Sequence, residues 1–306
     1  MPRLTIATCQ FPVTSDPVRN AQWAARQMRA AKTRGAHVAH FPECALSGYA
    51  GPDLDSYEGY EWSALRNARE LVLALARELR LWVVVGSAHR LTGKHKPHNS
   101  LYVVDDRGEL VGRYDKRFCA GDRRARTGDL AHFTPGNHLT VFELRGVRCG
   151  AQICHDYRYP ELYRDAKGAG VELMFHSFHA GGISAANYKL MQAQVGRSFA
   201  RLNPGSTLPE ITMPAAMITA AADNHLWISC ANSSRKNSCW GAFSVRPDGV
   251  IAGRLRKQMP GVLLTKIERP TRYYDSTVAW RERAIAGRLH SGRLVDDPRS
   301  RDRKRL

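Results

Sequence analysis

Apolar and polar positions along this chain follow two periods, one typical of strands and one typical of helices. Short apolar, β-branched runs bounded by Gly, Pro, Asn or Asp indicate buried strands. Stretches whose apolar residues recur about every three or four positions indicate helices that cover a sheet. The predicted strands are residues 4–8, 37–41, 82–86, 99–104, 109–114, 139–144, 147–153, 173–177, 226–231, 241–245 and 250–254. The predicted helices are residues 20–32, 62–79, 160–169, 187–202 and 213–224.

The order of these elements predicts an α/β protein with mixed sheets and outer helices. Strands alternate with helices, yet several neighbouring strands are joined by short turns that favour antiparallel hairpins. These turns are Arg107-Gly108, Arg145-Gly146 and Pro247-Asp248-Gly249. Residues 203–210 form one loop-like insertion, and no short-period repeat occurs. We predict one domain over residues 1–270 and a basic C-terminal extension over residues 271–306.

The C-terminal extension is strongly basic, which raises the question of a nucleic-acid partner. The 306-residue chain has a formal net charge of +18, and residues 281–306 hold nine Lys or Arg against four Asp or Glu, a net +5. Such a segment fits either a nucleic-acid partner or a solvated tail. Because no RNA-binding or helix-turn-helix motif accompanies the charge, we interpret the segment as a solvated tail and expect no nucleic-acid partner.

Cysteine usage and hydropathy indicate a cytoplasmic protein. The seven cysteines are an odd number without a CxxC pair, which argues against a zinc site and a disulfide framework. No stretch approaches the roughly 18 apolar residues of a membrane span, and the N-terminus lacks the pattern of a signal peptide. We therefore expect reduced thiols, no bound metal and no membrane.

Polar or reactive side chains follow three of the predicted strands. Glu43 lies in HFPECALSGY, where a buried carboxylate is costly unless it is paired or used; a strand-end cap is the alternative. Lys116 lies in GRYDKRF, where a surface lysine is the alternative. Cys154 ends the apolar strand in RCGAQICHDYRYPELYR, where a buried structural thiol is the alternative.

As a set, these three side chains supply the chemistry of a cysteine hydrolase. The thiolate is the reactive form of a cysteine, so Cys154 needs a base or a cation nearby. The carboxylate of Glu43 is able to take the thiol proton, and the ammonium of Lys116 is able to stabilise negative charge that develops on a substrate.

The ordered motifs resemble the nitrilase superfamily, the carbon–nitrogen hydrolases, and its amidase-like branch. The family has a Glu-Lys-Cys triad in the chain order found here. The resemblance covers roughly residues 3–255 and rests on these segments: TIATCQFPV, FPECALSGY, YDKRF, FTPG at 133–136, CHDYRYPELYR, ADN at 222–224, GAFS at 241–244 and PDG at 247–249.

The resemblance implies a four-layer αββα sandwich, assembled as a homo-oligomer, that needs no cofactor and no metal. It implies hydrolysis of an amide or N-carbamoyl substrate with Glu43 as base, Lys116 as oxyanion stabiliser and Cys154 as nucleophile. Ammonia or an amine would leave a thioester on the cysteine. An acyltransferase with the same triad, a nitrilase, and a catalytically silent nucleic-acid-associated scaffold are the alternatives.

Two residues depart from the family pattern. Many members carry a second glutamate seven residues before the glycine of the Pro-Gly turn, and Asp129 occupies that position here. We expect Asp129 to be a fourth catalytic residue that orients Lys116 or water, with a loop cap as the alternative. His155 follows the cysteine and is expected to contact substrate or to tune the thiolate.

Three further residues are candidates for substrate binding. Arg158 would bind a substrate carboxylate, or it would pair with Asp156 or Glu161 as a structural residue. Phe178 and His179 would line the pocket by analogy with the family. His179 also lies three residues after His176, a spacing that metal ligands use, but no third ligand is evident, so pocket lining is favoured.

Overall fold

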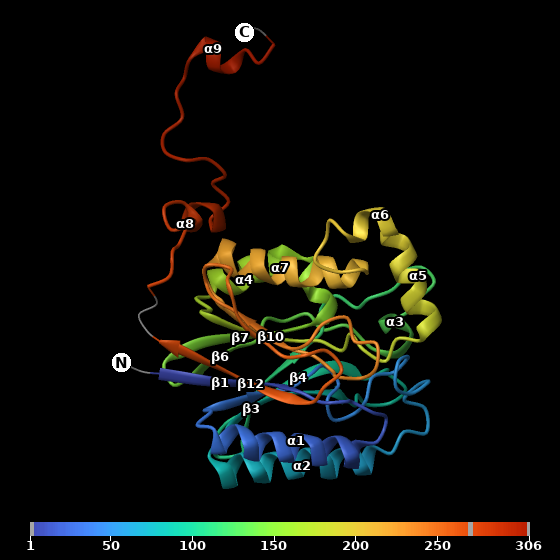
Figure 1. The fold of residues 1–306 in the computed structure, drawn as a ribbon. Coiled ribbons are helices and arrows are strands. Elements are labelled where there is room, and N and C mark those ends of the chain that lie inside the picture. Colours follow the sequence, from blue (N-terminus) through green and yellow to red (C-terminus); the bar gives the residue numbers. More distant parts are fainter. Residues whose placement is uncertain (1–2, 269–271, 305–306) are drawn as a thin grey trace.

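Two six-stranded sheets lie face to face, with helices on both outer faces (Figure 1). Helices α1 (Pro17–Thr33) and α2 (Trp62–Leu79) cover the first sheet. Helices α4 (Pro160–Gly168) and α7 (Leu208–Asn224) cover the second. This arrangement confirms the predicted four-layer αββα sandwich.

The computed structural model describes residues 3–268 and 272–304. The predicted domain boundary between residues 270 and 271 therefore lies outside the described residues. Among the described residues, none of the helices combines the length and the apolar character that a membrane span requires.

The first sheet carries two of the three predicted triad residues. Its strand order is β12-β1-β2-β3-β4-β5. The central strands β1, β2 and β3 pair in parallel, and the outer strands pair antiparallel. The strands are β1 (Arg3–Gln10), β2 (Val38–His40), β3 (Trp82–His89), β4 (His98–Val104), β5 (Leu110–Asp115) and β12 (Gly261–Glu268).

The second sheet repeats this topology and carries the predicted nucleophile. Its order is β11-β10-β9-β8-β7-β6, with β7, β8 and β9 parallel in the centre. The strands are β6 (Val141–Leu144), β7 (Val147–Ile153), β8 (Leu173–Ser177), β9 (Trp227–Ala231), β10 (Phe243–Val245) and β11 (Ile251–Arg254).

Three apolar layers hold the sandwich together. The first layer packs α1 and α2 on one sheet around Phe41 and Leu65, and the third packs α4 and α7 on the other around Tyr163 and Met217. The middle layer fills the space between the sheets. Its members include Leu4, Ile6, Val38, Val84, Leu101, Val103 and Tyr114 from the first sheet and Leu144, Cys149, Ala151, Ile153, Leu173 and Phe175 from the second.

Three details of the predicted elements were wrong. The helix predicted at 187–202 is broken at Gly196, which has a φ of 77°, into α5 (Ala185–Val195) and α6 (Arg197–Ala200). The insertion predicted at 203–210 is shorter, because Thr207 caps α7 and the helix begins at Leu208. The prediction also lacked β12, which pairs along the whole length of β1.

Short helices complete the chain. The helix α3 (Asp129–His132) and the 3₁₀ helix η1 (Cys154–Arg158) lie at the predicted site. Beyond the second sheet, α8 (Arg281–Ile285) contacts α4, and α9 (Pro298–Arg301) lies away from the sandwich (Figure 1). All residues from 286 to 304 are exposed, as expected of a solvated segment.

Candidate active site

The structure brings Glu43, Lys116 and Asp129 into direct contact. Glu43 follows β2, Lys116 follows β5, and Asp129 begins α3. The Lys116 Nζ atom lies 2.8 Å from Glu43 Oε1 and 2.7 Å from Asp129 Oδ2. The Lys116 side chain is 1% exposed and that of Glu43 is 0% exposed, so these charges interact in a low-dielectric environment. One buried ammonium is therefore shared by two carboxylates.

The two oxygens of the Glu43 carboxylate have different environments. Oε1 accepts hydrogen bonds from Lys116 Nζ and, at 2.7 Å, from the side-chain amide of Asn99. Oε2 is buried without a hydrogen-bond partner among the described residues. The backbone N–H of Glu43 donates to the carbonyl of Phe178 at 3.2 Å, which ties the loop to the second sheet. Oε2 is thus the oxygen that is free to accept a proton.

The charges of this cluster set the protonation of Lys116. Burial opposes the charged ammonium, but Asp129 and Glu43 outweigh it and hold the Lys116 pKa well above its ordinary value. The Asp129 pKa is lowered in spite of burial, because Lys116 Nζ, the Tyr49 hydroxyl and the Ala120 N–H all favour its charged form. Lys116 is therefore a cation and Asp129 an anion at neutral pH.

Cys154 reaches the cluster from the opposite sheet. It follows β7 with a φ of 43°, a left-handed backbone conformation that is uncommon outside glycine. Burial raises the pKa of its thiol well above the ordinary value, the Glu43 carboxylate raises it further, and Lys116 lowers it. The thiol is therefore protonated at rest beside a carboxylate that is able to take the proton.

Two glycines allow the loops of Glu43 and Lys116 to approach their neighbours. A Cβ atom on Gly86 would lie 2.2 Å from the Pro42 carbonyl oxygen and 2.5 Å from the Cys44 nitrogen. A Cβ atom on Gly136 would lie 2.4 Å from the Asp115 carbonyl oxygen. The N–H of Gly136 also donates to the Lys116 carbonyl at 2.8 Å. Both close approaches exclude any side chain at these positions.

Asp156 fixes the turn that follows the cysteine. Its carboxylate accepts from the N–H groups of Ile153 and Phe118, at 3.1 and 2.8 Å, and from the Tyr114 hydroxyl at 2.8 Å. Burial raises the Asp156 pKa to about 6 against these hydrogen bonds. The structural role predicted for Arg158 as a partner of Asp156 is thus taken by other groups.

Of the four predicted substrate-binding residues, His155 is the one beside the nucleophile in the chain. It is half-buried, and burial followed by the charge of Lys116 lowers its pKa. Arg158 is exposed, with its guanidinium 4.7 Å from the Tyr157 ring centroid, in a groove between α4 and α7. Phe178 is 0% exposed, and its ring stacks on the His176 ring with the two centroids 4.3 Å apart. Phe178 contacts the Glu43 loop through its backbone carbonyl, which accepts from the Glu43 N–H.

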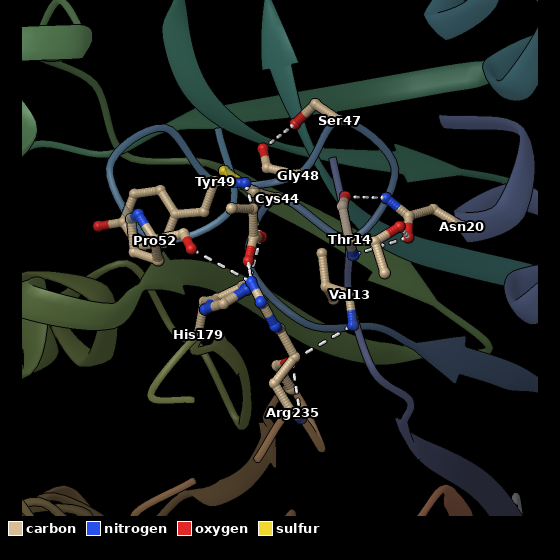
Figure 2. Close-up of polar contacts among 12 residues, drawn as sticks. Val13, Thr14, Asn20, Cys44, Ser47, Gly48, Tyr49, Pro52, His179 and Arg235 are labelled. Atoms are coloured by element: carbon tan, nitrogen blue, oxygen red, sulfur yellow. Dashed lines mark hydrogen bonds and ion pairs between the residues drawn. The ribbon is translucent and has the colours of Figure 1, made fainter. Parts of the chain in front are cut away.

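His179 belongs to a buried ion cluster next to Tyr49 (Figure 2). Its Nε2 atom lies 2.9 Å from Asp53, and both side chains are 0% exposed. Asp53 also pairs with Arg235 and accepts from the Tyr49 N–H at 2.9 Å. Burial opposes the charged ring, but Asp53 outweighs it and raises the His179 pKa. Figure 2 shows His179 and Arg235 converging on the loop that carries Tyr49 and Pro52.

Several residues of the site were not predicted. Tyr49 lies inside the glutamate motif, and its hydroxyl contacts both Asp129 and Lys116. Asn99 is the second residue of β4 and lies between two other polar residues, His98 and Ser100, so no local sequence signal distinguishes it. His176 and His179 do not form a metal pair, since His176 contacts Tyr163 and Cys154 whereas His179 contacts Asp53. Within the described part of the chain, no three His, Cys, Asp or Glu side chains are grouped as around a metal ion.

The family model described as carbon-nitrogen hydrolase matches residues 5–273. The chain belongs to the carbon–nitrogen hydrolase family. Relatives include the deaminated glutathione amidase of Bos taurus, 23% identical over 86% of this chain and 76% of the relative. The 2-oxoglutaramate amidase of Bacillus subtilis is 25% identical over 56% of this chain and 64% of the relative.

Other matches to this carbon–nitrogen hydrolase are shorter. The deaminated glutathione amidase of Yersinia enterocolitica is 31% identical over 34% of this chain and 38% of the relative. The chain spans about half the length of most of the first curated relatives, from 38% to 64%. An amidase from Nesterenkonia sp. has the same fold, with a TM-score of 0.70 at 20% identity over 94% of this chain and 96% of that one.

Proposed function

We propose that this protein hydrolyses the C–N bond of a small amide or N-carbamoyl substrate through a thioester on Cys154. The observation that carries the proposal is the buried Lys116 ammonium held between Glu43 and Asp129, with one oxygen of Glu43 free. The names of relatives support the substrate class, since they include amidases of deaminated glutathione, 2-oxoglutaramate and N-carbamoylputrescine. A variant of the Nesterenkonia amidase carries a Michael adduct of acrylamide at its active-site cysteine.

The first half of the reaction forms the thioester. Glu43 Oε2 takes the thiol proton as Cys154 Sγ attacks the carbonyl carbon, and the C=O π electrons move onto the oxygen. Lys116 and backbone N–H groups stabilise this oxyanion. When the carbonyl re-forms, the C–N bond breaks, and the leaving nitrogen takes the proton from Glu43 and departs as ammonia or an amine.

The second half releases the acid. Glu43, again a carboxylate, takes a proton from water as the water oxygen attacks the thioester carbon. The new oxyanion occupies the same position beside Lys116. The C–S bond then breaks, Cys154 leaves as a thiolate and recovers the proton from Glu43. The product is a carboxylic or carbamic acid, and the protein returns to its starting state.

The cluster at His179 supports an anionic or strongly polar substrate. His179 and Arg235 bring two cations to one carboxylate, that of Asp53, next to the Tyr49 ring at 5.3 Å from the His179 ring centroid. We propose His155 and His179 as the substrate-contacting residues, because His155 follows Cys154 in η1 and His179 follows Phe178, whose carbonyl accepts from the Glu43 N–H. The position of Arg158 over Tyr157 does not support the same role. The homo-oligomer, the cytoplasmic location and the absence of a nucleic-acid partner stay predictions.

The test combines turnover with trapping. The protein is screened for ammonia release from amides, N-carbamoyl amino acids and nitriles, and acyl adducts are sought by intact-mass spectrometry. We expect turnover of at least one amide or N-carbamoyl compound and an adduct that disappears in Cys154→Ala. The matched control is Cys119→Ser, a half-buried cysteine outside the triad that should keep both signals. Hydrolysis that persists in Cys154→Ala contradicts the proposal.

A further inference from the structure

His176 connects the second sheet to the peptide bond of the predicted nucleophile. It lies on β8 and its side chain is fully buried. Its Nε2 atom is 3.1 Å from the carbonyl oxygen of Cys154, and its Nδ1 atom is 2.5 Å from the Tyr163 hydroxyl. Tyr163 is itself fully buried on α4. These contacts form a chain from the outer helix layer, through β8, to the cysteine.

The hydrogen bonds from Tyr163 through His176 to Cys154 all point the same way, from donor to acceptor. Burial lowers the His176 pKa to about 3, so the ring is neutral and carries one N–H. The Cys154 carbonyl only accepts, which places that hydrogen on Nε2. Nδ1 is then an acceptor for the Tyr163 hydroxyl, which burial keeps protonated by raising its pKa well above the ordinary value. The Cys154 carbonyl therefore selects the tautomer of His176, and the Tyr163 hydroxyl supports this tautomer by donating to Nδ1.

The carbonyl that His176 contacts belongs to the same peptide unit as the N–H of His155. Because C=O and N–H of a peptide are coupled by resonance, a hydrogen bond to the oxygen makes the N–H a stronger donor. In nucleophile elbows, the N–H of the residue after the nucleophile is one of the oxyanion donors. The positive φ of Cys154 is the elbow conformation at this position.

We propose that His176 is a positioning residue that strengthens the oxyanion donor at His155 by hydrogen bonding to the Cys154 carbonyl. The inference deepens the proposed acyl-transfer function and rests on it. Packing alone does not require a polar ring at this place, because His176 stacks on Phe178, with ring centroids 4.3 Å apart, in an apolar cluster where a phenylalanine ring would fill the same volume. The imidazole adds two hydrogen bonds, one to the Cys154 carbonyl and one to the Tyr163 hydroxyl that supports it.

Three substitutions separate the hydrogen bond from the packing. In His176→Gln the side-chain amide nitrogen takes the place of Nε2, so a donor to the Cys154 carbonyl is kept. In His176→Asn the amide nitrogen takes the place of Nδ1, so the donor to the Cys154 carbonyl is lost. His176→Phe keeps the ring alone. Loss of one oxyanion donor lowers kcat about 10²–10³-fold. Hydrogen bonding to the carbonyl strengthens the donor on the same peptide by about 10–30% of its free energy. Loss of that strengthening should therefore lower kcat about two- to eightfold. We expect this drop in kcat, with KM unchanged, in His176→Phe and His176→Asn. In His176→Gln we expect kcat to return toward the wild-type value.

Alkylation separates this role from simple support of the cysteine. Iodoacetamide reacts with Cys154 Sγ at an sp³ carbon, so no oxyanion forms. We expect the Phe and Asn variants to be alkylated at the wild-type rate although their amide turnover falls. Equal losses in alkylation and turnover would mean that His176 only holds the thiol in place, and this outcome overturns the proposal.

The peptide itself gives a readout that needs no substrate. Cys154-His155 is the only Cys-His pair in the sequence, so labelling with ¹³C′-cysteine and ¹⁵N-histidine isolates one carbonyl–amide correlation. We expect upfield shifts of this carbonyl and amide nitrogen in His176→Phe, and wild-type positions in His176→Gln. If His176→Phe does not fold, Tyr163→Phe replaces it and should shift the same signals by a smaller amount. Unchanged signals in the folded variant overturn the inference.

The two proposals fail differently. A wild-type protein that hydrolyses no compound in the panel contradicts the proposed function, while the carbonyl–amide correlation still tests the hydrogen bond. Wild-type turnover together with equal kcat values for the Phe, Asn and Gln variants contradicts the role of His176 alone.

Discussion

The ammonium of Lys116 lies 2.7 Å from a carboxylate oxygen of Asp129, although aspartate is one methylene shorter than the glutamate usual at that position in the family. The shorter side chain reaches because Asp129 begins α3 and its N–H donates to the Ala120 carbonyl at 2.8 Å, which draws the helix toward the lysine loop. Asp129 is bonded by Lys116, Tyr49 and Ala120 together. Its contacts are those of a counter-ion for Lys116, and Glu43 keeps the free oxygen.

Replacing Asp129 by asparagine should weaken catalysis by removing that counter-ion. A hydrogen bond between charged groups contributes about 1.5–3 kcal/mol, which corresponds to a loss of about 10- to 100-fold in kcat/KM. The matched variant Asp129→Glu keeps the charge and should lose less. Steady-state kinetics on the best substrate measure both. Wild-type kcat/KM in Asp129→Asn would show that the charge is not needed.

Tyr49→Phe should lower activity without a large loss of packing. The hydroxyl donates to Asp129 and contacts Lys116 Nζ at 3.3 Å, so its removal leaves two buried charges with one polar neighbour fewer. We expect a loss of about 1.5–3 kcal/mol in the free energy of unfolding and a lower kcat. Tyr60→Phe is the control, because its hydroxyl bonds a neutral carbonyl of the same loop, Ser47, at 2.8 Å. Urea unfolding and kcat that change equally in both variants would contradict the prediction.

The His179–Asp53 pair should give the protein a pH window of stability. The His179 pKa is raised in the folded state, so its contribution is complete below about 6.5 and is lost as the pH rises through the folded value. The Asp53 pKa is lowered in spite of burial, because His179 and Arg235 favour the carboxylate. Its contribution is complete above about 3.8 and is lost as the pH falls through the folded value.

Thermal unfolding from pH 3 to pH 9 measures this window. We expect the wild-type midpoint to exceed that of His179→Gln most between about pH 4 and 6.5, with the difference shrinking at both ends. Asp53→Asn should remove the same window. A constant difference across the range would mean that the pair contributes packing but no charge interaction.

Gly86→Ala should move the Glu43 loop. The new methyl group would meet the Pro42 carbonyl oxygen at 2.2 Å, and backbone on both sides prevents an easy adjustment. We expect destabilisation of at least about 1–3 kcal/mol, as for overpacked cores, together with loss of turnover. Gly112→Ala on β5 is the control, since its nearest contact is Thr140 at an ordinary 3.5 Å. Similar unfolding and kinetics for the two variants would refute the argument.

The sequence located candidate site residues where a polar or reactive side chain follows a predicted strand. Glu43, Lys116 and Cys154 each follow a predicted strand, and such positions are visible without knowledge of the fold. The same periodicity located α2 and β7 at their observed bounds. Asp129 was found by its spacing from Gly136, which the family resemblance made meaningful.

Contacts between distant segments were beyond local patterns. The pairing of β12 with β1 joins residues more than 250 positions apart, such as Thr8 and Leu263, and no short-range signal encodes it. The pair of Asp53 with His179 depends on how two loops from different sheets meet. The left-handed conformation of Cys154 is likewise imposed by Asp156 and the turn around it, since cysteine has no preference for it.

The three residues of the proposed triad come from both sheets, with Glu43 and Lys116 following strands of one and Cys154 following a strand of the other. The thickness of the apolar layer between the sheets therefore sets how far the base stands from the thiol. Residues of this layer such as Val103 and Phe175 would then act as spacers between the proposed base and the proposed nucleophile. Substitutions far from the three side chains would therefore alter activity, because a methyl group gained or lost in the middle layer would change the distance between the Glu43 carboxylate and the Cys154 sulfur.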